Sequence, residues 1–289
     1  MATIWEQVTA KAKLTSLPQV YLQLREVLDH PDFAMADVAA VISSDPGITA
    51  RLLRLVNSPF FGFAAKIETV SRAISMLGTQ QVHDLVLATT VVERFQGMSS
   101  EVMDMTTYWR RSIDCGVMSR MLAYQCNVLD SERLFVCGLL RDMGHLIMYQ
   151  SIPELAQQAI ERATETEQPI YRVEQDLFGL NYARVGGALM RLWGMPKCLQ
   201  ESTEFHIQPE RANEFPLETS IVHLASVLTE AEQSKVLEDS ESWLHKVHPV
   251  AWQVTDLSPQ QCEVSREEAG KQVDKVLSLI YPQPARAQA

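Results

Sequence analysis

The chain has 289 residues and a net charge of −11, with 46% apolar and 21% charged residues. This composition is typical of a folded chain with a sizeable core. The acidic balance, with a pI of about 5.1, argues against nonspecific binding to nucleic acid or to an anionic membrane surface. We therefore expect neither DNA nor a membrane among its partners.

The helices expected before residue 96 are defined by apolar spacing and by capping residues. Glycine is scarce, alternating strand patterns are rare, and helix-forming residues are common, so we expect an all-α fold. Ser16 precedes Pro18, and Asp45 precedes Pro46, which marks two helix starts. The expected helices span residues 4–13, 18–29, 36–43, 46–56, 70–77 and 81–95.

The rest of the chain continues the helical pattern. One helix is expected over 101–125, and the next is capped by Ser131 and runs through Arg141 and Asp142. Further helices are expected over 153–167, 169–177, 181–193, 196–206, 217–230 and 265–280. Residues 232–259 are polar and interrupted, and 282–289 form an expected loose tail. A boundary near 95–100 separates segment 1–98 from segment 99–210, with 211–289 as a helical extension packed on the latter.

Cysteine usage and the first residues indicate a reducing compartment. Five cysteines occur without a CxxC pair, at Cys115, Cys126, Cys137, Cys198 and Cys262. An odd number without a pairing pattern is typical of reduced thiols. Residues 1–13 lack the apolar core of a signal peptide, and no apolar stretch approaches a membrane span in length. The expected location is the cytoplasm.

A charged pair interrupts one of the most apolar runs of the chain. Arg141 and Asp142 follow the run Leu-Phe-Val-Cys-Gly-Leu-Leu at 134–140. A carboxylate there needs a partner, because an unpaired one in apolar surroundings is costly. The segment resembles the GLLHDIGKL signature of HD-type metal phosphohydrolases, in which neighbouring His and Asp side chains bind a metal ion. Here Arg141 stands at the His position, and a guanidinium has no lone pair for a metal.

Short motifs along about two-thirds of the chain resemble the HDOD domain in order and spacing. They are Leu17-Pro18, ISSDP at 42–46, ARLLRLVNS at 50–58, FFG at 60–62, VSRAI at 70–74, LG at 77–78, Trp109, the Arg141–Asp142 segment, VG at 185–186 and WGMP at 193–196. The resemblance implies a multi-helical, HD-domain-like bundle over 99–210 with an N-terminal helical subdomain over 1–98. It also implies a role in bacterial signal transduction in place of established hydrolysis.

Four of the metal-ligand positions that the resemblance implies carry other residue types. The replaced positions are Arg111 in Trp109-Arg110-Arg111-Ser112, Arg141, Tyr182 at the start of YARVG, and Ser226. Asp142 and His206 are retained. Two arginines repel a divalent ion, which prefers neutral imidazoles and carboxylates. We therefore expect a degenerate site with no catalytic residue, no metal and no other cofactor, in which Arg111 or Arg141 pairs with Asp142.

An enzymatic alternative uses other side chains near the same motif. Asp142, His145, His206 and His223 can be imagined as a rearranged metal site. The protein would then be a metal-dependent phosphohydrolase, for example a phosphodiesterase for cyclic dinucleotides. Gly144 weakens the helix at this point, and a histidine near a core is more often hydrogen-bonded than metal-bound.

Binding alternatives arise outside hydrolysis. Two short helices over 37–56 resemble a helix-turn-helix, but Arg51 and Arg54 are the cations of its second helix, so packing is the preferred interpretation. An anion such as a nucleotide or phosphate would suit Arg111 and Arg141. The aromatic segment 60–63 is a candidate surface for protein partners, although core packing is the preferred interpretation there as well.

These observations predict a non-catalytic bacterial signalling protein of the cytoplasm. We expect it to act as a regulatory module that binds a signalling protein partner or a ligand. The motifs identify neither of these.

Overall fold

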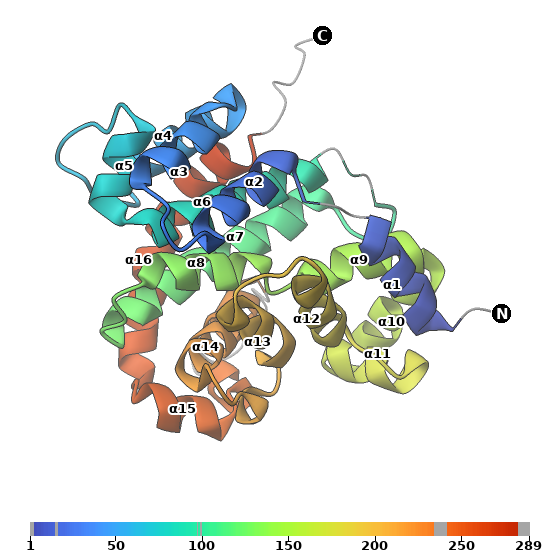
Figure 1. Cartoon of the computed structure of the whole chain (residues 1–289). Coiled ribbons are helices and arrows are strands. Elements are labelled where there is room, and N and C mark those ends of the chain that lie inside the picture. Colours follow the sequence, from blue (N-terminus) through green and yellow to red (C-terminus); the bar gives the residue numbers. More distant parts are fainter. Residues whose placement is uncertain (1–2, 15–16, 97, 99, 234–241, 283–289) are drawn as a thin grey trace, which may run out of the picture. The chain divides into compact units, whose positions relative to one another are not determined.

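Helices form all of the regular secondary structure in the computed structural model, which describes residues 3–14, 17–96, 98, 100–233 and 242–282 (Figure 1). The all-α fold expected from the sequence is confirmed. The chain forms two compact units, unit 1 from 1–16 and 99–269 and unit 2 from 17–98 and 270–289. These units differ in their residues from the three consecutive segments 1–98, 99–210 and 211–289, which remain a prediction.

Unit 2 is a helical group with one central apolar helix. It contains α2 (Gln19–Asp29), α3 (Met35–Ser43), α4 (Pro46–Val56), α5 (Val70–Leu77), α6 (Thr79–Gln96) and the last part of α16 (Pro259–Ile280). Asp45 caps α4 as expected, because its Oδ1 accepts the Ile48 N–H at 2.9 Å. Helix α6 packs against α2, α4 and α5 and is buried along most of its length.

The helix pair that resembles a helix-turn-helix is part of this packing. Ile48, Leu52 and Leu55 of α4 are buried. Arg51 of α4 forms an ion pair with Glu93 of α6. The apolar face of α4 and one of its two arginines are therefore used within unit 2.

Unit 1 holds the candidate site. Its elements are α1 (Ile4–Leu14), α7 (Met105–Gln125), α8 (Ser131–Leu140), α9 (Met143–Ser151), α10 (Pro153–Thr166), α11 (Ile170–Phe178), α12 (Tyr182–Leu192), α13 (Lys197–Phe205), η1 (Pro209–Arg211), α14 (Pro216–Gln233), η2 (Ser242–Lys246), α15 (Pro249–Thr255) and the first part of α16. Helix α7 packs on α8 and α14, and α12 packs on α9 and α13 (Figure 1). These contacts surround the end of α8.

The expected continuous helix through Arg141 and Asp142 is wrong. Helix α8 ends at Leu140, and α9 starts at Met143. At Gly144, α9 touches α12 backbone to backbone, since a Cβ atom there would overlap the carbonyl oxygen of Tyr182. The break redirects the chain so that α9 can make this close contact.

Two further helix starts differ from expectation. Helix α7 starts at Met105 instead of residue 101, because Asp104 Oδ2 accepts the Thr107 N–H at 2.8 Å and caps the helix there. Helix α16 starts at Pro259, within the segment 232–259 that the sequence suggests is interrupted; η2 and α15 also lie in that segment. Residues 234–241 and the expected tail 283–289 lie outside the described residues. Among the described helices, none combines the length and the apolar character that a membrane crossing requires.

Candidate functional site: a buried polar network

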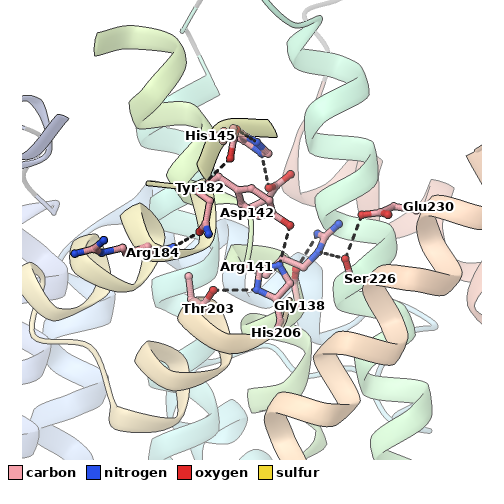
Figure 2. A network of polar contacts seen from close by, with 12 residues as sticks. Gly138, Arg141, Asp142, His145, Tyr182, Arg184, Thr203, His206, Ser226 and Glu230 are labelled. Atoms are coloured by element: carbon pink, nitrogen blue, oxygen red, sulfur yellow. Dashed lines mark hydrogen bonds and ion pairs between the residues drawn. The ribbon is translucent and has the colours of Figure 1, made fainter. Parts of the chain in front are cut away.

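Unit 1 brings together the positions that the sequence singles out. Figure 2 shows five of them in one network, and each is buried. They are Arg141 and Asp142 between α8 and α9, Tyr182 as the first residue of α12, His206 directly after α13, and Ser226 on α14. The sixth, Arg111, lies on α7, which packs against both α8 and α14.

Asp142 forms an ion pair with a histidine that follows it by one helical turn. His145 Nδ1 lies 2.7 Å from Asp142 Oδ1, and His145 Nε2 lies 2.9 Å from Glu174 Oε1 on α11. Because carboxylate oxygens accept hydrogen bonds, both ring nitrogens of His145 donate, and the ring is an imidazolium. The other oxygen of Glu174, Oε2, accepts the backbone N–H of Tyr182 at 2.9 Å and holds the start of α12.

The electrostatic setting keeps both members of this pair charged. Burial alone would raise the pKa of Asp142, but the charge and hydrogen bond of His145, with the charges of Arg141 and Arg111, hold it well below its usual range. Burial alone would lower the pKa of His145, but Asp142 and Glu174 raise it to about 9. At neutral pH the pair is therefore a carboxylate and an imidazolium.

The Arg141 side chain is bound by α14 and by its own helix. Its Nε donates to Ser226 Oγ at 3.1 Å, and its Nη1 donates to the carbonyl oxygen of Gly138 at 3.4 Å. Ser226 Oγ also lies 3.5 Å from Glu230 Oε1. Burial alone would lower the pKa of Arg141, but the acidic groups around it outweigh burial and raise it. A permanent positive charge thus occupies the position at which the HD signature has a metal-binding histidine.

The retained His206 is neutral and has both ring nitrogens engaged. Its Nδ1 donates to the carbonyl oxygen of Thr203 at 2.9 Å, so its Nε2 is the acceptor for the Tyr182 hydroxyl at 3.1 Å. Burial, together with the charge of Arg141, lowers the pKa of His206 to about 3. Burial raises the pKa of Tyr182 well above its usual range, so the phenol keeps the proton that it donates.

His223 extends the same network from α14. Its Nδ1 donates to the carbonyl oxygen of His206 at 2.7 Å, and its Nε2 accepts the backbone N–H of His248 at 2.9 Å. Burial lowers the pKa of His223 to about 4, so this ring is also neutral. Its one lone pair is used by a backbone donor.

The prediction that Asp142 forms an ion pair with Arg111 or Arg141 is wrong. In the described part of the chain, the ion pair of Asp142 is with His145. Arg141 and Arg111 act on Asp142 through their charges and not through a direct bond. Helix geometry explains the choice, because residues three apart lie on the same side of α9 and Asp142 stands at its start.

These side chains do not fit a divalent metal ion. A metal needs neutral imidazoles and carboxylates with lone pairs to give. The lone pairs of His206 and His223 already accept hydrogen bonds, and both nitrogens of His145 carry protons. Among the described residues, no group of three or more His, Cys, Asp or Glu side chains is arranged to hold a metal.

Sequence reasoning missed Glu174, which closes the network from α11. A signal was present, because Ile170, Val173 and Leu177 form the apolar stripe of that helix and Glu174 falls within it. Glu174 is 2% exposed. A carboxylate in an apolar stripe indicates a buried partner, although the stripe alone does not identify His145.

Comparison with known sequences gives one family. The HDOD domain pattern matches residues 14–209 of the chain. An uncharacterized protein of Treponema pallidum (strain Nichols) is 25% identical over 197 residues, which are 67% of this chain and 37% of that protein. The chain therefore matches little more than a third of that relative's length.

Solved structures share the fold. A provisionally named phosphohydrolase from Shewanella amazonensis SB2B has a TM-score of 0.73 at 22% identity, covering 96% of this chain and 97% of that one. A provisionally named signal transduction protein from Marinobacter aquaeolei VT8 has a TM-score of 0.68 at 19% identity, covering 91% of this chain and 58% of that one. At these identities the likeness concerns the fold alone. Because the family pattern covers more than half of its residues, the chain belongs to the HDOD domain family.

Proposed function

We propose that this HDOD chain is a non-catalytic signalling module that works by recognition. The observation that carries the proposal is that the three histidines of the buried network are already engaged by groups of the protein. The imidazole lone pairs of His206 and His223 are used inside the protein, and His145 is a cation between two carboxylates. Metal-assisted hydrolysis needs such lone pairs for the ion that activates water.

Similarity to other proteins is consistent with this role. The HDOD family is related both to signal transduction proteins and to HD phosphohydrolases, and one structure of the same fold is provisionally named for signal transduction. The proposal extends to a signalling protein partner in the cytoplasm, with a nucleotide or phosphate as a further ligand. The chemistry of Arg141 and Arg111 separates this chain from a hydrolase with an intact His–Asp pair.

Metal content and phosphodiesterase activity test the proposal together. Purified protein is incubated with Mn²⁺, Fe²⁺, Zn²⁺ or Mg²⁺, dialysed, and measured by mass spectrometry of the metals and by turnover of bis-p-nitrophenyl phosphate and cyclic dinucleotides. We expect far less than one metal per chain and no turnover above that of Asp142→Ala. One tightly bound metal per chain, with turnover that Asp142→Ala abolishes, would overturn the proposal.

A restored pocket provides the positive control. The combined variant Arg111→His, Arg141→His, Tyr182→His and Ser226→Asp returns the residue types of the HD pattern to the four replaced positions. If this variant retains metal and the wild type retains none, the four replaced residues account for the loss of metal binding. If the variant does not fold, the comparison of wild type with Asp142→Ala still decides the question.

A further inference from the structure

A cavity on the outer side of the network contains arginines that the proposed function does not use. Its volume is about 810 Å³, and α11, the start of α12 and the segment from α13 to η1 form its walls. Each wall contributes one arginine to the lining: Arg172, Arg184 and Arg211. Figure 2 shows Arg184 extending away from Tyr182 and His206, so the same helix start faces the network on one side and the cavity on the other.

The three arginines are exposed, and each guanidinium group lies near an aromatic ring. Arg172 lies 5.8 Å from the centroid of the Tyr171 ring, Arg184 lies 5.3 Å from that of Trp5, and Arg211 lies 4.9 Å from that of Phe205. Within the described residues, none of the three forms an ion pair with a carboxylate, and Arg211 donates to Gln208 Oε1 at 3.2 Å. In the part of the chain that the structure describes, their remaining N–H donors have no acidic partner.

The charge around this cavity is opposite to that of the whole chain. The chain carries −11, so it repels anions at long range. Two acidic residues also line the cavity, but Glu204 is paired with Arg191, which lies outside the lining. Asp176 is then the one acidic lining residue without such a pair in the described structure. The charges of the side chains that line the cavity therefore favour the binding of an anion.

Size and chemistry narrow the class of anion. Planar guanidinium groups bind phosphate oxygens through paired hydrogen bonds, which a single ammonium does not match. The volume lies in the range of cavities that bind small organic molecules. The other lining side chains include the amides Gln168, Gln175 and Gln208 and the phenol Tyr171, which offer donors and acceptors to a sugar or a base.

We propose that this arginine cavity binds a small organic phosphate of nucleotide size. Arg172, Arg184 and Arg211 hold the phosphate groups, and the amide side chains contact the uncharged remainder. In the described structure the side chains of the three arginines form no hydrogen bond or ion pair with Asp142, His145 or His206, so the proposal goes beyond the loss of metal chemistry and does not depend on it.

Isothermal titration calorimetry tests the cavity with ADP, pyrophosphate and adenosine as probes. We expect ADP and pyrophosphate to bind, and adenosine to bind at least about tenfold more weakly, because charged hydrogen bonds supply the affinity. The variant Arg172→Gln, Arg184→Gln, Arg211→Gln should lose at least about tenfold in ADP affinity. Raising NaCl from about 50 to about 300 mM should weaken ADP binding to the wild type.

Two control variants separate this cavity from other sites. Arg162→Gln removes an exposed arginine of α10 that does not line the cavity and should leave ADP affinity unchanged. Asp142→Asn alters the buried network and should also leave it unchanged, which distinguishes the cavity from a nucleotide bound beside Arg111 and Arg141. Thermal unfolding confirms that each variant is folded, and single substitutions replace the triple variant if that one unfolds.

Three results would overturn the proposal. The first is no binding of either ADP or pyrophosphate at millimolar concentration. The second is equal ADP affinity in wild type and in folded arginine variants. The third is adenosine binding as tightly as ADP, which would assign the affinity to the base and not to the phosphates.

Discussion

The His145 ring lies flat against the Tyr182 ring, with centroids 4.0 Å apart and an angle of 19° between the planes. Tyr149, one turn further along α9, also stacks on His145, with centroids 5.3 Å apart and an angle of 14°. A cation over an aromatic face is favourable by about 0.5–2 kcal/mol. Since Asp142 and Glu174 hold the two ring nitrogens, the protonation of His145 depends on the packing of α9, α11 and α12.

Alkaline pH should destabilise the protein through His145. Its pKa is about 9 in the folded state, against 6.5 as the ordinary value. The folded state therefore keeps a proton that the unfolded chain releases, and this stabilising contribution, complete below pH 6.5, is lost as the pH rises towards 9. Urea unfolding across this range should show a decline in the free energy of unfolding on the order of 3 kcal/mol. A decline of the same size in His145→Gln would assign it to other groups.

Replacing His145 should itself cost stability at neutral pH. In His145→Gln, the buried carboxylates of Asp142 and Glu174 face each other without the cation between them. We expect the free energy of unfolding to fall by about 3–5 kcal/mol, measured by urea denaturation at pH 7. The matched control is His245→Gln, at an exposed histidine, with an expected change within about 0.5 kcal/mol. Similar losses in both variants would contradict a buried ion pair.

The contribution of the Arg141–Ser226 hydrogen bond to stability can be measured by comparing Ser226 with another buried serine of α14. Ser226→Ala removes the acceptor of the buried Arg141 Nε and should lower the free energy of unfolding by about 1.5–3 kcal/mol. Ser220 is also buried on α14, but its Oγ has no hydrogen-bond partner among the described residues. Ser220→Ala should therefore be neutral or slightly stabilising, and denaturation of both variants should separate them clearly.

Helix packing at Gly144 should tolerate no side chain. Gly144→Ala places a methyl group against the Tyr182 carbonyl, so we expect a loss of at least about 3 kcal/mol, or no folded protein. Gly270 lies within α16, and a Cβ atom there meets nothing within 4 Å. Gly270→Ala should raise the free energy of unfolding by about 0.5–1 kcal/mol, because alanine favours the helix. Thermal and urea unfolding of the pair give the comparison.

Local signals in the sequence are sufficient to predict most of the helices. Asp45 and Asn181 cap the helices that follow them, because a short side-chain acceptor next to an apolar run specifies a helix start without help from the rest of the fold. The break after Leu140 gives no such signal. It depends on the approach of Gly144 to Tyr182, which is a contact between residues 38 positions apart in the chain.

The same limit applies to the polar network. The resemblance to the HD signature implies that Arg141, Asp142 and His206 lie in one pocket, and the structure brings them into one network. The pairing inside the pocket was not predictable, because Glu174 carries no motif and meets His145 only when α9 and α11 converge. Pairing in a buried network is a property of helix crossings, which a single sequence does not encode locally.

The close contact at Gly144 also bears on how HD-like signatures should be interpreted. Gly186 lies on the α12 side of the same contact, where a Cβ atom would sit 3.4 Å from the Gly144 backbone nitrogen. Gly144 belongs to the stretch that resembles the hydrolase signature, yet its task is to let two backbones touch. A signature of this kind therefore combines two independent requirements, one architectural and one chemical. In this chain the glycine is present while Arg141 stands at the histidine position, so the glycine half of the signature is by itself evidence for a shape and not for a reaction.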